Sequence, residues 1–258
     1  MVLPPRPPSD RAGVPGFAAG RRWPTAWTPE GDALARSWLA AYYGNVSFMD
    51  HCVGYVLRAL DGLGLAEDTL VIYTSDHGDM MYEHGMFQKG VFYEACAHVP
   101  CLVRFPGRVA AGASVGAVGH LTALLPTTLE LCGLPRPEGL EGRSLAEALR
   151  RAADPSGAPL PAAEAFSEIG LDGGSGGRFM LRLGEYKYCR NARDRDELYN
   201  LATDPLEFSN LLGEHGEAAG EAAEVADLLR ERLVARVPTK PYPLGRATMT
   251  VDGHLGRL

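Results

Sequence analysis

The run Thr69-Leu70-Val71-Ile72-Tyr73-Thr74-Ser75-Asp76-His77-Gly78-Asp79 is the most informative stretch of the sequence. Residues 69–74 are mostly β-branched or apolar, which predicts a strand buried on both faces, as in a parallel sheet. The side chains of Asp76 and His77 follow this strand directly. Ligands of open parallel sheets bind beyond the carboxyl ends of the strands, so this doublet can hold a divalent cation. The alternative is that Asp76 caps a turn and that His77 is polar surface.

Helices and a second strand flank this run. Apolar side chains recur every three or four residues over residues 30–63, which predicts a long helix. Residues 101–105 predict a second buried strand, and residues 122–132 predict a helix that Gly133 ends. The alternation favours an α/β domain with a mainly parallel sheet over residues 30–152.

The second half of the chain has a different pattern. Residues 153–161 are rich in Pro, Gly and Ala and predict a linker. Residues 162–237 predict a small α+β subdomain with an antiparallel sheet, because residues 178–190 read as a β-hairpin and residues 214–237 as a helix.

The two ends of the chain predict little regular structure. Residues 1–29 contain seven prolines and are expected to be extended, and residues 238–258 are expected to form a peripheral tail. No secretory signal is visible in the first residues, and no apolar run reaches the ~18 residues that a membrane span needs.

Composition excludes several classes of protein. The chain has 258 residues and a net charge of −7, from 25 Lys and Arg against 32 Asp and Glu. No basic stripe is present, so nucleic acid is not an expected partner. The five cysteines are dispersed and form no CxxC pair, which favours free thiols in a reducing compartment such as the cytoplasm.

Two further side chains near the doublet can carry chemistry. The ammonium group of Lys89, beside a metal ion, suits the non-bridging oxygens of an anionic ester, although alone it is a solvated lysine. The imidazole of His84 can protonate a leaving oxygen, because an unperturbed imidazole titrates near neutrality. Taken alone, His84 is an ordinary loop histidine.

Four blocks, in order, resemble the C-terminal half of an arylsulfatase-like sulfatase of the alkaline phosphatase superfamily. They lie at residues 42–50; 70–85 with Lys89; 99–107 and 125–133; and 197–201 with 204–205 and 210–211. The Asp-His-Gly of the second block and the Glu-Leu-Tyr-Asn-Leu and Asp-Pro of the fourth are specific as a set.

This resemblance implies an alkaline-phosphatase-like α/β sandwich and a hydrolase of sulfuric esters. It implies that Asp76 and His77 are two ligands of one divalent cation, usually calcium, with magnesium or manganese as alternatives. Lys89 would contact the sulfate oxygens. In the family, a formylglycine made from the Cys or Ser of C/S-x-P-S-R attacks sulfur while the metal polarises the ester.

The sequence departs from the family in one important respect. It contains no C-x-P-S-R or S-x-P-S-R, and the two metal-binding aspartates of the family's first half are absent. We therefore expect the chain alone to bind metal weakly and to be inactive. Either a separate chain supplies the N-terminal half, or the sequence is truncated or its start misassigned. An uncovered sheet edge would favour homo-oligomers.

Three functions fit these observations. The first is hydrolysis of sulfate esters, and the second is hydrolysis of phosphate or phosphonate esters by the same superfamily. The third is a non-catalytic remnant or interaction module.

Overall fold

The computed structural model describes residues 1–7, 20–116, 118–152, 164–169, 177–191, 194–213 and 216–236. The linker and the tail predicted at 153–161 and 238–258 lie outside these residues. Within the described ranges, no helix combines the length and apolar character needed to cross a bilayer.

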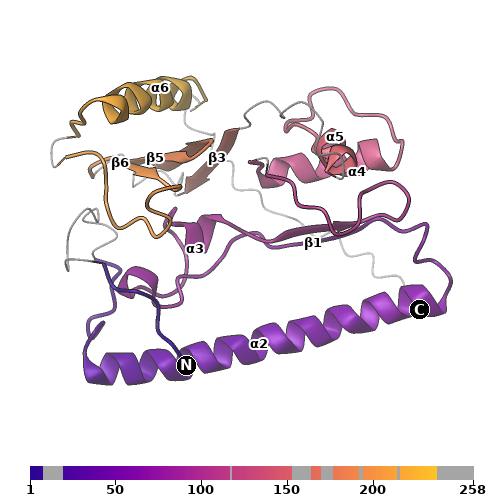
Figure 1. The fold of residues 1–258 in the computed structure, drawn as a ribbon, viewed down its shortest axis with the longest axis horizontal. Coiled ribbons are helices and arrows are strands. Elements are labelled where there is room, and N and C mark those ends of the chain that lie inside the picture. The colour runs from indigo at the N-terminus through magenta and orange to yellow at the C-terminus, as the bar shows by residue number, and fades with distance from the viewer. Residues whose placement is uncertain are drawn as a thin grey trace, which may run out of the picture.

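The predicted long helix is confirmed as α2, Pro29–Gly62. It begins at Pro29 because the side chain of Thr28 accepts a hydrogen bond from the Gly31 amide, 3.1 Å away, and acidic residues occupy the first turn. Figure 1 shows α2 running along one side of the molecule. Ala35 and Leu39 are buried, but every residue from 40 to 51 is exposed.

Strands β1, Val71–Thr74, and β2, Cys101–Arg104, form a two-stranded ribbon next to α2. The expectation of a buried, mainly parallel sheet is wrong for these two strands, which pair antiparallel with Thr74 opposite Cys101. The connecting residues 75–100 leave and return at the same end of the ribbon, so they form a large loop instead of a helical crossover. The ribbon is only partly covered, since Leu102 is 65% exposed.

Two helices cover the ribbon on the side away from α2 (Figure 1). The helix predicted at 122–132 begins as the 3-10 turn η2, Leu121–Ala123, and continues as α4, Leu124–Leu131. It is followed by α5, Ala146–Arg151. Phe105, Leu131 and Ala146 form the buried cluster that joins these helices to the ribbon.

The predicted antiparallel sheet of the C-terminal part is confirmed. Its four strands follow in the order β3, Glu164–Ile169; β4, Arg178–Leu183; β5, Tyr186–Asn191; and β6, Glu197–Asn200. Helix α6, Glu221–Arg236, covers one face of this sheet (Figure 1), where Leu181, Leu198 and Leu233 are fully buried. The helix begins seven residues later than expected, after Gly220, whose φ is +58°.

The other face of this sheet packs against the loop that follows β1. Phe92, from that loop, lies against Met180 of β4 and Cys189 of β5. The short helix α3, Glu94–Ala97, belongs to the same loop. The C-terminal sheet therefore supports the segment in which the candidate functional residues lie.

Candidate functional site

The predicted doublet lies just beyond the end of β1. Asp76 Oδ2 is 3.5 Å from His77 Nε2, and the side chain of Asp76 is 84% exposed. Slight desolvation raises the pKa of Asp76, but the hydrogen bond from the His77 amide and the nearby His77 ring lower it below its ordinary value. The carboxylate is therefore ionised and open to a ligand.

Local hydrogen bonds orient the imidazole of His77. Its Nδ1 lies 2.8 Å from the Gly78 carbonyl oxygen, so Nδ1 carries the proton of the neutral ring and donates it there. This leaves Nε2 as the nitrogen that faces Asp76 with a free lone pair. The hydroxyl of Ser75 donates to the His77 carbonyl at 2.9 Å and fixes the same turn.

Gly78 allows this turn to pack against α3. Its amide donates to the Cys96 carbonyl at 2.8 Å. A Cβ atom at residue 78 would lie 2.0 Å from the Ala95 carbonyl oxygen, far inside van der Waals contact. A side chain at this position would therefore push the doublet away from the rest of the fold.

The doublet presents two donor atoms that suit a divalent cation. One carboxylate oxygen and one imidazole nitrogen fit a divalent cation, but a hard cation such as Ca²⁺ takes about six to eight oxygen ligands. Among the residues that the structure describes, no group of three or more His, Cys, Asp or Glu side chains converges on one point. Further ligands would have to come from water or from outside these residues.

Lys89 lies in the loop that returns from the doublet. The Met80 amide donates to the Gln88 carbonyl at 2.8 Å, so the backbone beside Lys89 runs against the segment just after Asp76 and His77. The side chain of Lys89 is exposed. In the described part of the chain its amine has no hydrogen bond or ion pair, which leaves it available to an anion.

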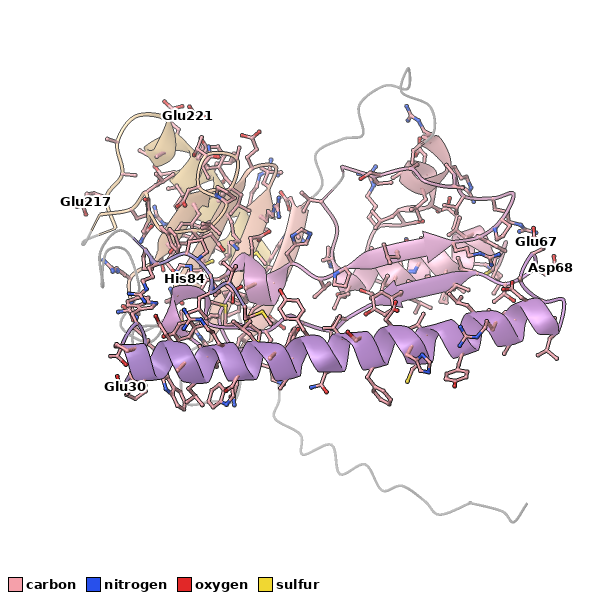
Figure 2. All side chains as sticks on the ribbon, turned by 60° about the horizontal axis from the view of Figure 1, so that its bottom comes forward. Glu30, Glu67, Asp68, His84, Glu217 and Glu221 are labelled. Atoms are coloured by element: carbon pink, nitrogen blue, oxygen red, sulfur yellow. The ribbon has the colours of Figure 1, made fainter. Side chains whose placement is uncertain are left out.

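His84 is not exposed beside these residues. It is 3% exposed, its Nε2 bonds to the Leu206 carbonyl at 2.9 Å, and its ring stacks on Tyr93 with centroids 4.0 Å apart. Burial lowers the pKa of His84 to about 4. Figure 2 shows it between α2 and the C-terminal sheet. The proton-donor role predicted for His84 finds no support in this geometry, which gives the ring a structural role.

A buried charge cluster that the sequence does not predict lies on the C-terminal sheet. Lys187 of β5 is 0% exposed, and its ammonium group pairs with Glu94 at 2.9 Å and with Glu207. The signal available in the sequence was a lysine within the otherwise buried strand Tyr186-Lys187-Tyr188-Cys189. Its two partners lie 93 residues before it and 20 residues after it, so no local pattern could identify them.

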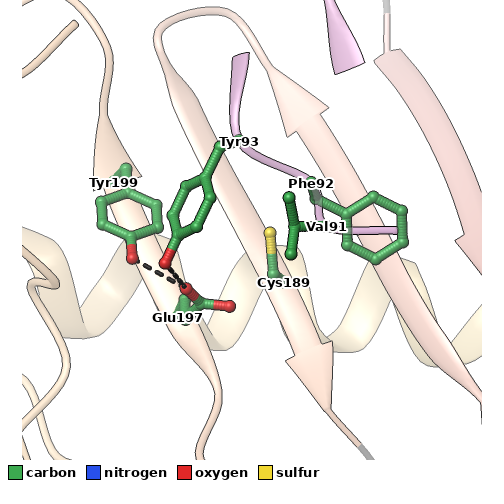
Figure 3. Close-up of a pocket in the computed structure, with 6 residues that line it drawn as sticks. All are labelled: Val91, Phe92, Tyr93, Cys189, Glu197 and Tyr199. Carbon is green, nitrogen blue, oxygen red and sulfur yellow. Dashed lines mark hydrogen bonds between the residues drawn. The ribbon is translucent and has the colours of Figure 1, made fainter. Parts of the chain in front are cut away.

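A second buried acid, Glu197, borders a small pocket next to this cluster (Figure 3). The pocket is lined by Val91, Phe92, Tyr93, Cys189, Glu197 and Tyr199. The carboxylate accepts hydrogen bonds from Tyr199 at 2.8 Å, from Tyr93 at 3.3 Å and from Asn191 at 3.1 Å. Burial nevertheless raises the pKa of Glu197 to about 7.

Comparisons with known proteins identify the family and the fold that this chain resembles. Arylsulfatase K of Danio rerio is 37% identical over 175 residues, which are 67% of this chain and 33% of that protein. The phosphonate monoester hydrolase of Agrobacterium radiobacter superposes with a TM-score of 0.62 and 30% identity, over 75% of this chain and 40% of that one. A protein solved with its substrate D-glucosamine-2-N,6-O-disulfate gives 0.62 and 27%, over 74% and 38%.

The chain spans about a third of the length of the curated relatives that it matches. Two family models match it directly. The sulfatase model covers residues 14–134, and the model of the C-terminal part of N-sulphoglucosamine sulphohydrolase covers residues 82–237, more than half of the chain. The chain belongs to the sulfatase family, and its structural neighbours have the alkaline-phosphatase-like fold.

Proposed function

We propose that this chain supplies the metal-binding and sulfate-binding part of a sulfuric ester hydrolase. The observation that carries the proposal is the exposed doublet at the end of β1, where Asp76 Oδ2 and His77 Nε2 lie 3.5 Å apart. Membership of the sulfatase family and the likeness to arylsulfatase K support the choice of substrate class.

The doublet would hold one divalent cation, Ca²⁺ in the first instance, with Mg²⁺ or Mn²⁺ as alternatives. When bound, such a cation polarises the ester and offsets negative charge on its oxygens. Asp76 contributes an ionised oxygen because its pKa is lowered, and His77 contributes Nε2 because Nδ1 is committed to the Gly78 carbonyl.

Lys89 would contact the non-bridging oxygens of the ester. Its exposed ammonium group is a compact charge that can donate up to three hydrogen bonds to an anion. Since the sequence contains no C/S-x-P-S-R segment, the proposal requires the formylglycine and the remaining metal ligands to come from another segment or chain. A separate polypeptide of this kind is thus a proposed partner.

One observation favours an alternative substrate. The phosphonate monoester hydrolase of Agrobacterium radiobacter is as similar in structure as the protein solved with a sulfated glucosamine. Phosphonate and phosphate esters also present anionic oxygens, which Lys89 and a cation at the doublet would neutralise equally well. Hydrolysis of such esters is therefore the second candidate.

Calorimetric titration of the chain with Ca²⁺ tests the metal site. We expect saturable binding that Asp76→Asn weakens by about tenfold or more. The substitution removes the negative charge of Asp76, which is one of the two proposed ligands. Asp68→Asn is the matched control, since Asp68 is also an exposed carboxylate but precedes β1, whereas Asp76 follows the other end of that strand. Equal affinity of the wild type and Asp76→Asn would refute the ligand assignment.

Anion titrations in the presence of Ca²⁺ then separate the candidates. Tighter binding of inorganic sulfate than of methylphosphonate, lost in Lys89→Met, supports the sulfate ester. The reverse order supports the phosphonate ester. If neither anion binds in a way that depends on Lys89, the non-catalytic module is the remaining function.

A further inference from the structure

The loop of residues 88–94, called here the Lys89 loop, is held through its backbone carbonyls. The Gln88 carbonyl accepts a hydrogen bond from the Met80 amide at 2.8 Å, and the Lys89 carbonyl accepts one from Arg21 at 2.7 Å. The backbone on both sides of the Lys89 side chain is thereby fixed by other segments of the chain.

The C-terminal sheet supplies the next two contacts. Arg178, at the start of β4, donates to the Gly90 carbonyl at 2.6 Å. Lys187 of β5 donates to the Phe92 carbonyl at 2.7 Å. Two basic residues of one sheet thus hold the loop at the carbonyls of Gly90 and Phe92, which come one and three residues after Lys89.

The contact of Lys187 is deeply buried. Burial opposes its charge, but Glu207 and Glu94 raise the pKa of Lys187 above its ordinary value, so it stays an ammonium ion. Glu207 also accepts a hydrogen bond from the Glu94 amide at 2.6 Å, and Arg182 pairs with Glu94 at 3.1 Å. Because separating the buried Lys187 from its carboxylate partners is costly, the end of the loop cannot leave the sheet easily.

The backbone of the loop adopts angles that need such support. Gln88 has a φ of +67° and Gly90 a φ of +100°. A positive φ is unfavourable for a non-glycine residue and persists when the surroundings over-determine it. A Cβ at residue 90 would lie 2.8 Å from the guanidinium group of Arg21, so Gly90 also permits the close approach of that side chain.

From these contacts we propose that Arg178 and Lys187 are positioning residues for Lys89. They fix the Lys89 loop on the C-terminal sheet, so the direction in which the exposed ammonium group meets an anion depends on that sheet. This inference rests on the proposed function, in which Lys89 binds the sulfate oxygens. It assigns to the C-terminal sheet a part in substrate binding although the sheet does not itself touch the substrate.

The sequence offers a clean probe for the test. It contains only three lysines: Lys89, Lys187 and Lys240. Lys187 is 0% exposed and ion-paired. In a Lys240→Arg background, reductive ¹³C-methylation labels Lys89 as the one exposed lysine. The chemical shift of its methyl resonance then reports the binding of inorganic sulfate, which is titrated in a buffer that contains Ca²⁺. A parallel titration with chloride at equal ionic strength is the control.

Arg178→Met is the main variant, because it removes the hydrogen bond to the Gly90 carbonyl. We expect its sulfate affinity to fall about fivefold or more, as for residues that act through a neighbour. Arg178→Gln, whose side-chain amide can still donate to the Gly90 carbonyl and which adds no lysine, should retain much of the affinity. The control is Arg232→Met, which removes an exposed ion pair to Glu164 in the same subdomain but has no contact with the loop.

Hydrogen exchange and thermal melting separate positioning from general loss of structure. Arg178→Met should speed amide exchange in residues 88–94, while Arg232→Met, at a similar melting temperature, should leave both exchange and affinity unchanged. Normal sulfate binding and normal amide exchange in Arg178→Met would overturn this inference and leave the proposed function intact. Absence of saturable, Lys89-dependent sulfate binding in the wild type would overturn the proposed function and the inference with it.

Discussion

Tyr199 donates a hydrogen bond to Glu197 across 2.8 Å, beside a pocket in which Glu197 is only 5% exposed (Figure 3). Tyr93 and Asn191 also donate to this group, and all three donors are neutral. Burial therefore outweighs hydrogen bonding and raises the pKa of Glu197 to about 7.

We predict that Glu197 makes folding less favourable as pH rises. Its pKa is 4.5 when unfolded and about 7 when folded, so between these values the folded chain holds a proton that the unfolded chain has lost. The stabilisation is complete below pH 4.5 and is lost as pH rises through 7, by about 3 kcal/mol at most. Denaturant unfolding should show Glu197→Gln gaining stability relative to wild type from pH 5 to 8.

Glu185→Gln is the control for this experiment, because Glu185 is exposed in the turn between β4 and β5. It should follow the wild type at every pH. If the difference in free energy of unfolding between Glu197→Gln and the wild type is constant from pH 5 to 8, Glu197 does not titrate in that range.

His84 should have the opposite pH dependence. Burial lowers its pKa from 6.5 to about 4, so the stability that it contributes is present above pH 6.5 and is lost as pH falls through 4. His84→Phe removes this linkage and leaves the Leu206 carbonyl without its partner, at a cost of about 1–3 kcal/mol at neutral pH. The difference between the free energies of unfolding of the wild type and of His84→Phe should shrink as pH is lowered from 7 to 4.

The same variant tests whether His84 stabilises the fold without taking part in metal binding. Ca²⁺ affinity should not change in His84→Phe, because the ring is buried away from solvent. His51→Phe, on the exposed face of α2, should alter stability by no more than about 0.5 kcal/mol. A neutral effect of His84→Phe on stability would contradict the role that its burial indicates.

Two glycines in contrasting surroundings give a third prediction. Gly78→Ala should destabilise the chain by about 1–3 kcal/mol and weaken Ca²⁺ binding, because the new methyl group would meet the Ala95 carbonyl at 2.0 Å. Gly44→Ala, in α2, meets nothing within 4 Å and should stabilise by about 0.5–1 kcal/mol. Thermal melting with and without Ca²⁺ measures both. Equal effects would mean that the turn after β1 is not tightly packed.

The fourth prediction concerns turnover. The purified chain should not hydrolyse a chromogenic aryl sulfate, because its sequence has no C/S-x-P-S-R nucleophile. A continuous absorbance assay with added Ca²⁺ measures this. Metal-dependent turnover that disappears in Lys89→Ala would show that the chain carries a nucleophile of another kind.

Local patterns were enough to predict several elements. The apolar repeat at three and four residues predicted α2, and two strand-like runs separated by Gly184-Glu185 predicted the hairpin of β4 and β5. These signals come from neighbours in the sequence, so they can be read without the tertiary structure. The strand before Asp76 was found for the same reason.

Long-range features could not be predicted. The apolar run of β1 does not encode the direction of its partner, so its antiparallel pairing with β2 was missed. The burial of His84 depends on Leu206 and Phe208, more than 120 residues later. A histidine in a polar loop gives no local sign of such contacts.

The ion pairs of Lys187 bear on how the chain can be divided. Glu94 belongs to the α/β domain of residues 30–152. Lys187 and Glu207 belong to the C-terminal subdomain of residues 162–237, which follows the proline-rich stretch at 153–161. Cleavage within that stretch would leave the Glu94 carboxylate on one fragment, and Lys187, still paired with Glu207, on the other. The two fragments should therefore remain associated after proteolysis, and neither should fold cooperatively when produced by itself.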